Sequence, residues 1–152
     1  MLSFCYPRGK FNDEVVSIIR RAGFIGARTV KSATRNIKDP FRMGTTAYAA
    51  SWFFGLAPYF RHVVASQDCG LFCFMLRNNL LLNFWDRVAI ETLDFVVDNG
   101  GIWHLWGHSW EVDENNDWVR LERVFCRVGE LSKEARKMNN SQLLRMNIDK
   151  NG

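Results

Sequence analysis

The chain has 152 residues, a length that predicts a single domain, and its net charge is +4. Apolar residues make up 47% of the sequence, which is enough for a hydrophobic core and excludes a disordered chain as the default. Basic residues concentrate in the first 62 positions, but neither a dense Lys/Arg run nor a nucleic-acid motif accompanies them. Composition therefore favours a globular domain with a mildly basic face, and we expect no nucleic acid as partner.

The first part of the chain predicts a strand, a helix and a second strand. An apolar run over residues 2–6 leads into residues 7–9, Pro-Arg-Gly, which is typical of a strand followed by a turn. Asn12 is a good N-cap for a helix whose apolar residues recur at helical spacing up to Gly23. Residues 26–30 then predict a second strand. Strand, helix and strand within so few residues indicate a βαβ unit of a parallel sheet.

Three later segments lack a clear pattern and are predicted as a long loop, a partly helical apolar segment and an unassigned stretch: residues 31–46, 47–65 and 68–82. Helical periodicity returns over residues 83–97, and residues 102–107 form a predicted strand. A last helix is expected after Asn116. Residues 132–152 are predicted as a polar, mobile tail with at most two helical turns. The fold class is therefore α/β, with one domain over residues 1–131.

The apolar segment and the cysteines limit the localisation. Residues 47–60 are interrupted by Ser51, Gly55 and Pro58 and fall short of the roughly 20 residues of a spanning helix, so we expect no membrane span. The opening residues show neither the basic nor the apolar region of a signal peptide. The four cysteines form no CxxC pair, which favours reduced thiols and a reducing cytoplasm, while the localisation itself stays unknown.

Two histidines, His104 and His108, are the first candidates for chemistry. Their spacing of four places both on one face of a strand or of a helix. The pair can therefore supply two ligands to zinc, with Asp113, Glu111 or a cysteine as the third. The alternative is that one histidine packs in the strand and the other lies in a loop. The run also lacks the Glu of the HExxH metalloprotease motif.

His108 taken alone suggests a different role. It lies between Trp106 and Trp110 at the predicted C-terminal end of a strand, where active residues of α/β barrels lie. Neighbouring indoles remove water from the imidazole, which suits a group that donates a proton near neutral pH. A structural histidine in a loop is the alternative. Arg8, after the first strand, and the two tryptophans are candidates for binding a sugar, although a surface arginine and core tryptophans are equally consistent with the pattern.

Two segments of the chain resemble the polysaccharide deacetylase family, the NodB-like carbohydrate esterases. Residues 4–12, Phe-Cys-Tyr-Pro-Arg-Gly-Lys-Phe-Asn, resemble the third motif region of that family. Residues 104–111, His-Leu-Trp-Gly-His-Ser-Trp-Glu, preceded by Gly-Gly-Ile-Trp, resemble the last motif of one of its branches. The similarity spans residues 2–128 and is weaker over residues 32–80.

The resemblance implies a deformed (β/α) barrel that removes acetyl groups from N-acetylated polysaccharides or oligosaccharides. The family binds a divalent metal, usually zinc, through one Asp and two His, and a second Asp is the base that activates the metal-bound water. A His of the last motif is the general acid that protonates the leaving amine. That role falls on His108 here, with His104 as the second choice.

The family's first two motifs, which carry the base and the metal ligands, have no counterpart in this sequence, and the Arg that steadies the base falls on Cys5. We therefore predict a partial (β/α) barrel of the NodB-like type that lacks its N-terminal strands. Zinc is expected for the full family domain and no metal for this chain. The predicted function is a fragment of a metal-dependent deacetylase, inactive without a missing N-terminal half as partner. The alternative is a non-catalytic glycan-binding or interaction protein derived from that fold.

Overall fold

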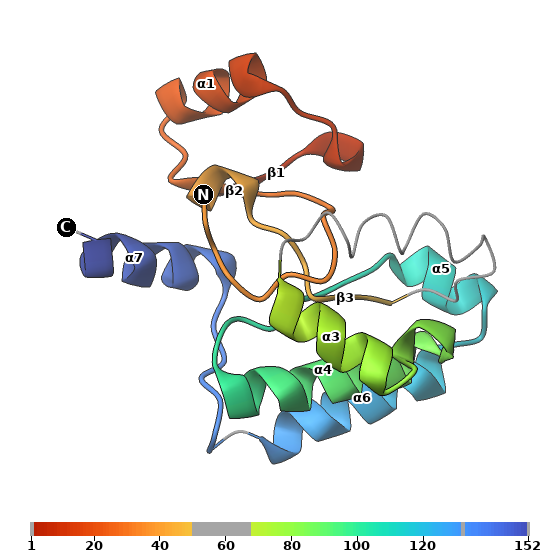
Figure 1. Ribbon diagram of the computed structural model, residues 1–152. Coiled ribbons are helices and arrows are strands. Elements are labelled where there is room, and N and C mark those ends of the chain that lie inside the picture. The colour runs from red at the N-terminus through yellow and green to blue at the C-terminus, as the bar shows by residue number, and fades with distance from the viewer. Residues whose placement is uncertain (1, 50–67, 132, 152) are drawn as a thin grey trace.

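The computed structural model describes residues 2–49, 68–131 and 133–151 (Figure 1). Its strands are β1 (Ser3–Cys5), β2 (Gly26–Arg28), β3 (Ala47–Tyr48) and β4 (Leu105–Trp106). Its α-helices are α1 (Asp13–Arg21), α3 (Cys69–Arg77), α4 (Trp85–Asn99), α5 (Ser109–Glu114), α6 (Trp118–Glu130) and α7 (Asn140–Asn151). Three short 3-10 turns are η1 (Pro7–Gly9), η2 (Pro40–Arg42) and η3 (Leu80–Leu82). None of the helices within these residues combines the length and the apolar character needed to cross a membrane.

The strands pair in parallel and follow one another in chain order. β1 pairs with β2, and β3 pairs with β4. A bridge between Arg28 and Met43, and a hydrogen bond from the Thr45 N–H to the Lys31 carbonyl, connect the two pairs through the extended segment before β3. Parallel neighbours in chain order are the arrangement found in (β/α) barrels, but the described residues close no barrel. The barrel of the deacetylase type therefore stays a prediction.

The N-terminal βαβ unit is confirmed. The Asn12 side chain accepts a hydrogen bond from the Val15 N–H at the start of α1. Val16 and Ile19 are the buried residues of this helix, and they face the β1–β2 pair through the apolar cluster around Tyr6. The chain leaves the helix through Gly23, whose φ of +86° is a conformation that glycine adopts at no steric cost.

The middle of the chain departs from the predictions in two places. Residues 47–65, predicted as partly helical, begin with strand β3, because the Thr46 and Ala47 N–H groups donate to the carbonyl of His104. The remainder of that prediction, residues 50–65, lies outside the described residues. The unassigned stretch contains α3, which is capped by the Asp68 carboxylate accepting from the Leu71 N–H. Strand β4 covers only two of the six residues predicted for it, while α4 and α6 lie where helices are predicted.

Helix α7 lies in the segment predicted as a mobile polar tail and is longer than the one or two turns expected there. It runs beside the β1–β2 pair in Figure 1, and Leu143 and Leu144 are buried. The side chain of Leu144 occupies the space over Gly26, where an added Cβ would approach Leu144 Cδ2 to 2.4 Å. Two apolar residues in a polar stretch are a weak local signal, and the strand glycine that receives them lies far away in the sequence.

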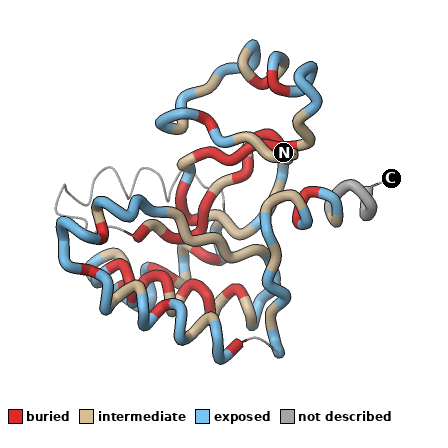
Figure 2. The backbone as a smooth tube through the Cα atoms, turned by 180° about the vertical axis from the view of Figure 1, so that it is seen from behind, coloured by how far each residue is buried: buried red, intermediate tan, exposed pale blue. Residues whose placement is uncertain are grey.

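The core is divided among three apolar clusters, and its buried segments are shown in red in Figure 2. Leu71, Met75 and Leu80 form the centre of one cluster, between α3 and α4. Trp85 and Val124 join α4 to α6 in another. The Trp85 Nε1–H donates to the Asp117 carboxylate at 2.8 Å, which satisfies the indole in the core. These helices support the sheet edge at which β3 and β4 pair.

Candidate functional site at the two ends of strand β4

His108 lies two positions after the end of β4. It is the N-cap residue of α5, and its backbone is extended. Its ring meets Trp106 edge-on at a centroid distance of 4.9 Å and stacks on Trp110 at 5.6 Å. The expected position between two indoles is therefore observed. The expected removal of water from the imidazole is not observed, because His108 is exposed and Trp110 keeps 55% of its surface accessible.

Tyr48 extends these three side chains into a row of four rings. It stacks on Trp106 with a centroid distance of 4.6 Å and an interplanar angle of 21°, since the β3–β4 register places Tyr48 directly opposite Trp106. Its hydroxyl donates to Glu111 Oε2 on α5. Burial, followed by the hydrogen bond to Glu111, raises the pKa of Tyr48 far above its usual range, so the phenol stays protonated. We call Tyr48, Trp106, His108 and Trp110 the aromatic row.

The aromatic row combines flat apolar faces with polar edges. A ligand ring with an apolar face can stack on an aromatic side chain. An exposed imidazole can then donate or accept a hydrogen bond at the edge of that ligand. Pyranose sugars have this form, with C–H faces and hydroxyl edges. Tyr48 is a member that the sequence did not identify, because it lies in the segment predicted as helical. The parallel pairing of β3 with β4 would have identified Tyr48, but the sequence carries no signal for that pairing.

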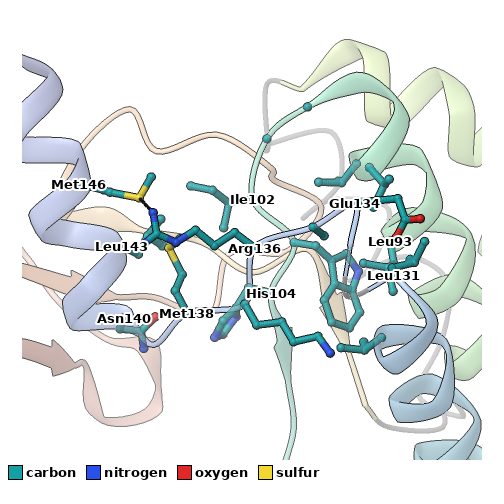
Figure 3. A pocket seen from close by; sticks show the side chains of 18 of the residues that line it. Leu93, Ile102, His104, Leu131, Glu134, Arg136, Met138, Asn140, Leu143 and Met146 are labelled. Atoms are coloured by element: carbon teal, nitrogen blue, oxygen red, sulfur yellow. Dashed lines mark hydrogen bonds between the residues drawn. The ribbon is translucent and has the colours of Figure 1, made fainter.

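His104 lies at the opposite end of β4 and has different surroundings. It is half-buried, and its Nδ1 lies 3.0 Å from the hydroxyl oxygen of Thr45, which is fully buried. Burial, and then the charge of Arg28, lower the pKa of His104 to about 4. An imidazole that is neutral at physiological pH does not suit the role of general acid, for which His104 was the second choice. His104 instead fits the interpretation of a packed strand histidine, and it lines a cavity (Figure 3).

The predicted zinc pair finds no third ligand among the described residues, in which no group of three His, Cys, Asp or Glu side chains is arranged to hold a metal. Two of the candidate ligands have other partners. Glu111 accepts the Tyr48 hydroxyl, and Asp113 accepts the Trp118 Nε1–H at 3.0 Å. No chemical step is therefore assigned to a metal at these described residues.

Arg8 lies where the sequence predicts it, in the turn η1 that follows β1, with φ of 54° and an exposed side chain. Within the described residues no hydrogen bond or ion pair joins Arg8 to the aromatic row. The structure thus gathers Trp106, His108 and Trp110 in one place and adds Tyr48 and Glu111 to them, whereas Arg8 and His104 lie elsewhere.

Comparison with protein-family models, with curated proteins and with solved structures finds no match to this chain. The resemblance to the deacetylases accordingly depends on the two sequence motifs alone.

Proposed function

We propose that this chain is part of a NodB-like polysaccharide deacetylase and that His108 is the general acid on the side of the leaving amine. One observation carries the proposal. His108 lies beyond the C-terminal end of a parallel strand, inside an aromatic row of which Trp110 is exposed to a ligand. A sugar ring stacked on this row brings the edge that bears its nitrogen substituent within reach of the imidazole.

The proton inventory of the reaction defines what His108 contributes. In N-deacetylation the amide C–N bond breaks, and the sugar nitrogen needs a proton to leave as an amine. The imidazolium of His108 donates that proton and becomes neutral. An exposed imidazole, which exchanges protons with water, is then ready for the next turnover. Activation of the attacking water is the work of groups outside the described residues.

A sugar titration tests the proposal. Oligomers of N-acetylglucosamine are expected to change the tryptophan fluorescence of the folded chain and to shift the ring-proton NMR signals of His108, which the His108→Ala variant assigns. Trp110→Ala is expected to weaken binding about tenfold, as for a central aromatic anchor. Trp118→Ala, which removes an indole of similar exposure on α6, is the matched control and leaves the affinity unchanged. The proposal is lost if no N-acetylated glycan produces either response.

A deacetylase assay tests the fragment interpretation separately. The chain alone, with added zinc and N-acetylglucosamine oligomers, is expected to release no acetate. Turnover by the isolated chain would show that its own residues complete the site, and the assignment of a partial domain would be wrong.

A glycan-binding protein without catalysis is the second candidate. The stacking of His108 on Trp110 favours it, because in such a protein the imidazole holds the indole in place and takes no part in a reaction. Oligomers of glucose distinguish the two functions, since they have the same ring faces and lack the nitrogen substituent. A general acid contacts the nitrogen, so His108→Ala should weaken binding of the N-acetylglucosamine oligomer and leave the glucose oligomer unaffected. Equal effects on both oligomers indicate binding without chemistry.

A further inference from the structure

A cavity of about 500 Å³ lies on the side of β4 opposite the aromatic row, between the approach to β4 and helix α7 (Figure 3). Apolar side chains form most of its wall: Leu93, Val96, Val97, Ile102, Trp103, Val128, Leu131, Met138, Leu143 and Met146. His104 and Asn140 are polar members of the same wall (Figure 3). Arg28 lines the same cavity.

Arg28 is the unusual member of this wall. It is only 7% exposed, yet the two groups that accept hydrogen bonds from its guanidinium are neutral. Its Nε–H donates to Asn140 Oδ1 at 3.0 Å and its Nη1–H to the Gly44 carbonyl at 2.5 Å. Among the described residues no carboxylate pairs with this guanidinium, and Nη2 makes no hydrogen bond. Buried arginines normally have an acidic partner, because removing a charge from water is costly.

The surroundings of Arg28 add positive charge. Burial lowers the pKa of Arg28 to about 10, which leaves it fully charged at neutral pH. His104 is neutral there and contributes no charge. Arg136 and Lys137 line the cavity, and Glu134 is the one acid among the described residues that do so. Arg136 donates to the sulfur of Met146 at 3.4 Å, and no ion pair joins it to a carboxylate among the described residues. The cavity thus has excess positive charge beside an apolar wall.

We propose that this cavity binds a small organic acid, with the carboxylate at Arg28 and the apolar part of the molecule along the wall near Leu143. A carboxylate supplies the missing counter-charge, and a planar guanidinium with an unused N–H matches it in geometry. The extent of the apolar wall indicates a body of several carbon atoms rather than an inorganic anion. This site is separate from the aromatic row and does not depend on the proposed deacetylase function.

Calorimetric titration with octanoate, with octanol as the uncharged probe of equal length, tests the site. Octanoate is expected to bind the folded chain with a stoichiometry of one, and octanol at least about tenfold more weakly. Arg28→Lys keeps the charge but loses the planar fork, so it should weaken octanoate about tenfold. Lys137→Ala should weaken it by a smaller factor through lost attraction. Arg87→Ala, which removes an exposed arginine of α4, is the control and leaves the affinity unchanged.

Mapping by NMR keeps the test decisive if Arg28 variants fail to fold. Octanoate is expected to shift the Arg28 Nε–H signal and the Asn140 side-chain amide of the wild-type protein. The proposal is overturned if folded protein takes up no octanoate, if octanol binds as tightly, or if the shifts fall on residues away from the cavity. An unchanged affinity in a folded Arg28→Lys variant overturns it as well.

Discussion

His104 and His108 are four positions apart on either side of one short strand, yet they are in opposite environments. His104 is half-buried, has a lowered pKa and contacts the buried hydroxyl of Thr45. His108 is exposed, and its ring packs against the indoles of Trp106 and Trp110. The spacing suggested a shared metal ion, but spacing fixes only the face on which two side chains lie. The surroundings of His104 come from Thr45 and Arg28, which are distant in sequence, whereas those of His108 come from its sequence neighbours Trp106 and Trp110.

Removal of Leu144 is expected to have the largest effect, since this side chain packs α7 against the β1–β2 pair. Leu144 is fully buried over Gly26. Leu144→Ala should lower the free energy of unfolding by about 2–5 kcal/mol, as for a truncated core leucine. Urea denaturation measures the change.

Leu82→Ala is the matched control, because Leu82 is 73% exposed and the chemical change is identical. It should alter the stability by less than about 0.5 kcal/mol. Equal effects of the two substitutions would mean that α7 does not pack on the strands in solution.

Acidification should destabilise the protein through His104. The folded-state pKa of His104 is about 4 and its ordinary value is 6.5, so the unfolded chain takes up a proton first as the pH falls. His104 therefore lowers stability between these two values, by about 2 kcal/mol at pH 5 relative to neutral pH. In His104→Gln the difference in unfolding free energy between pH 7 and pH 5 should shrink by that amount.

Arg28, Arg136, Lys137 and Glu134 line the same cavity as His104, and the His104→Gln variant keeps all four, so comparison with the wild type isolates the imidazole. A pH dependence that survives His104→Gln would indicate that His104 is accessible and protonated in the folded protein.

Tyr48→Phe tests the link between the aromatic row and α5. The substitution keeps the ring that stacks on Trp106 and removes the hydroxyl that donates to Glu111. We expect a loss of about 1 kcal/mol in the free energy of unfolding. In a double-mutant cycle with Glu111→Ala, most of that loss should disappear, because the partner is already absent. Additive effects would exclude a direct interaction.

The smallest effect is expected for His108→Ala. The ring is exposed and makes only aromatic contacts, so the free energy of unfolding should change by less than about 0.5 kcal/mol. A large destabilisation would identify His108 as a structural residue and would weaken its assignment as a general acid.

Local patterns predicted the regular part of the fold. Asn12 caps α1 as expected, and Gly23 ends it, because caps and glycine turns depend on neighbouring residues alone. Strand β3 was missed, since two residues carry no measurable periodicity and hydrogen bonds to β4 define the strand. The packing of Leu144 on Gly26 was missed for the same reason, as the contact joins distant positions.

The candidate site was predicted in part. His108, Trp106 and Trp110 are close in sequence, so their contacts follow from an alternating strand end and the first turn of a helix. The position of Tyr48 beside Trp106 and the separation of Arg8 from this group could not be predicted, because both depend on how distant segments pack. The buried charge of Arg28 had no sequence signal either, because an arginine at the end of a strand is normally exposed.

The hydrogen bond between Arg28 and Asn140 joins residues that are 112 positions apart. A contact of that length is expensive in chain entropy and forms late, because the intervening chain must first condense. On the ribosome, the β1–β2 pair emerges early but must wait for α7 before its surface near Gly26 is covered. A chain synthesised only to a point before α7 therefore exposes this surface, and exposed apolar surface of this kind favours aggregation.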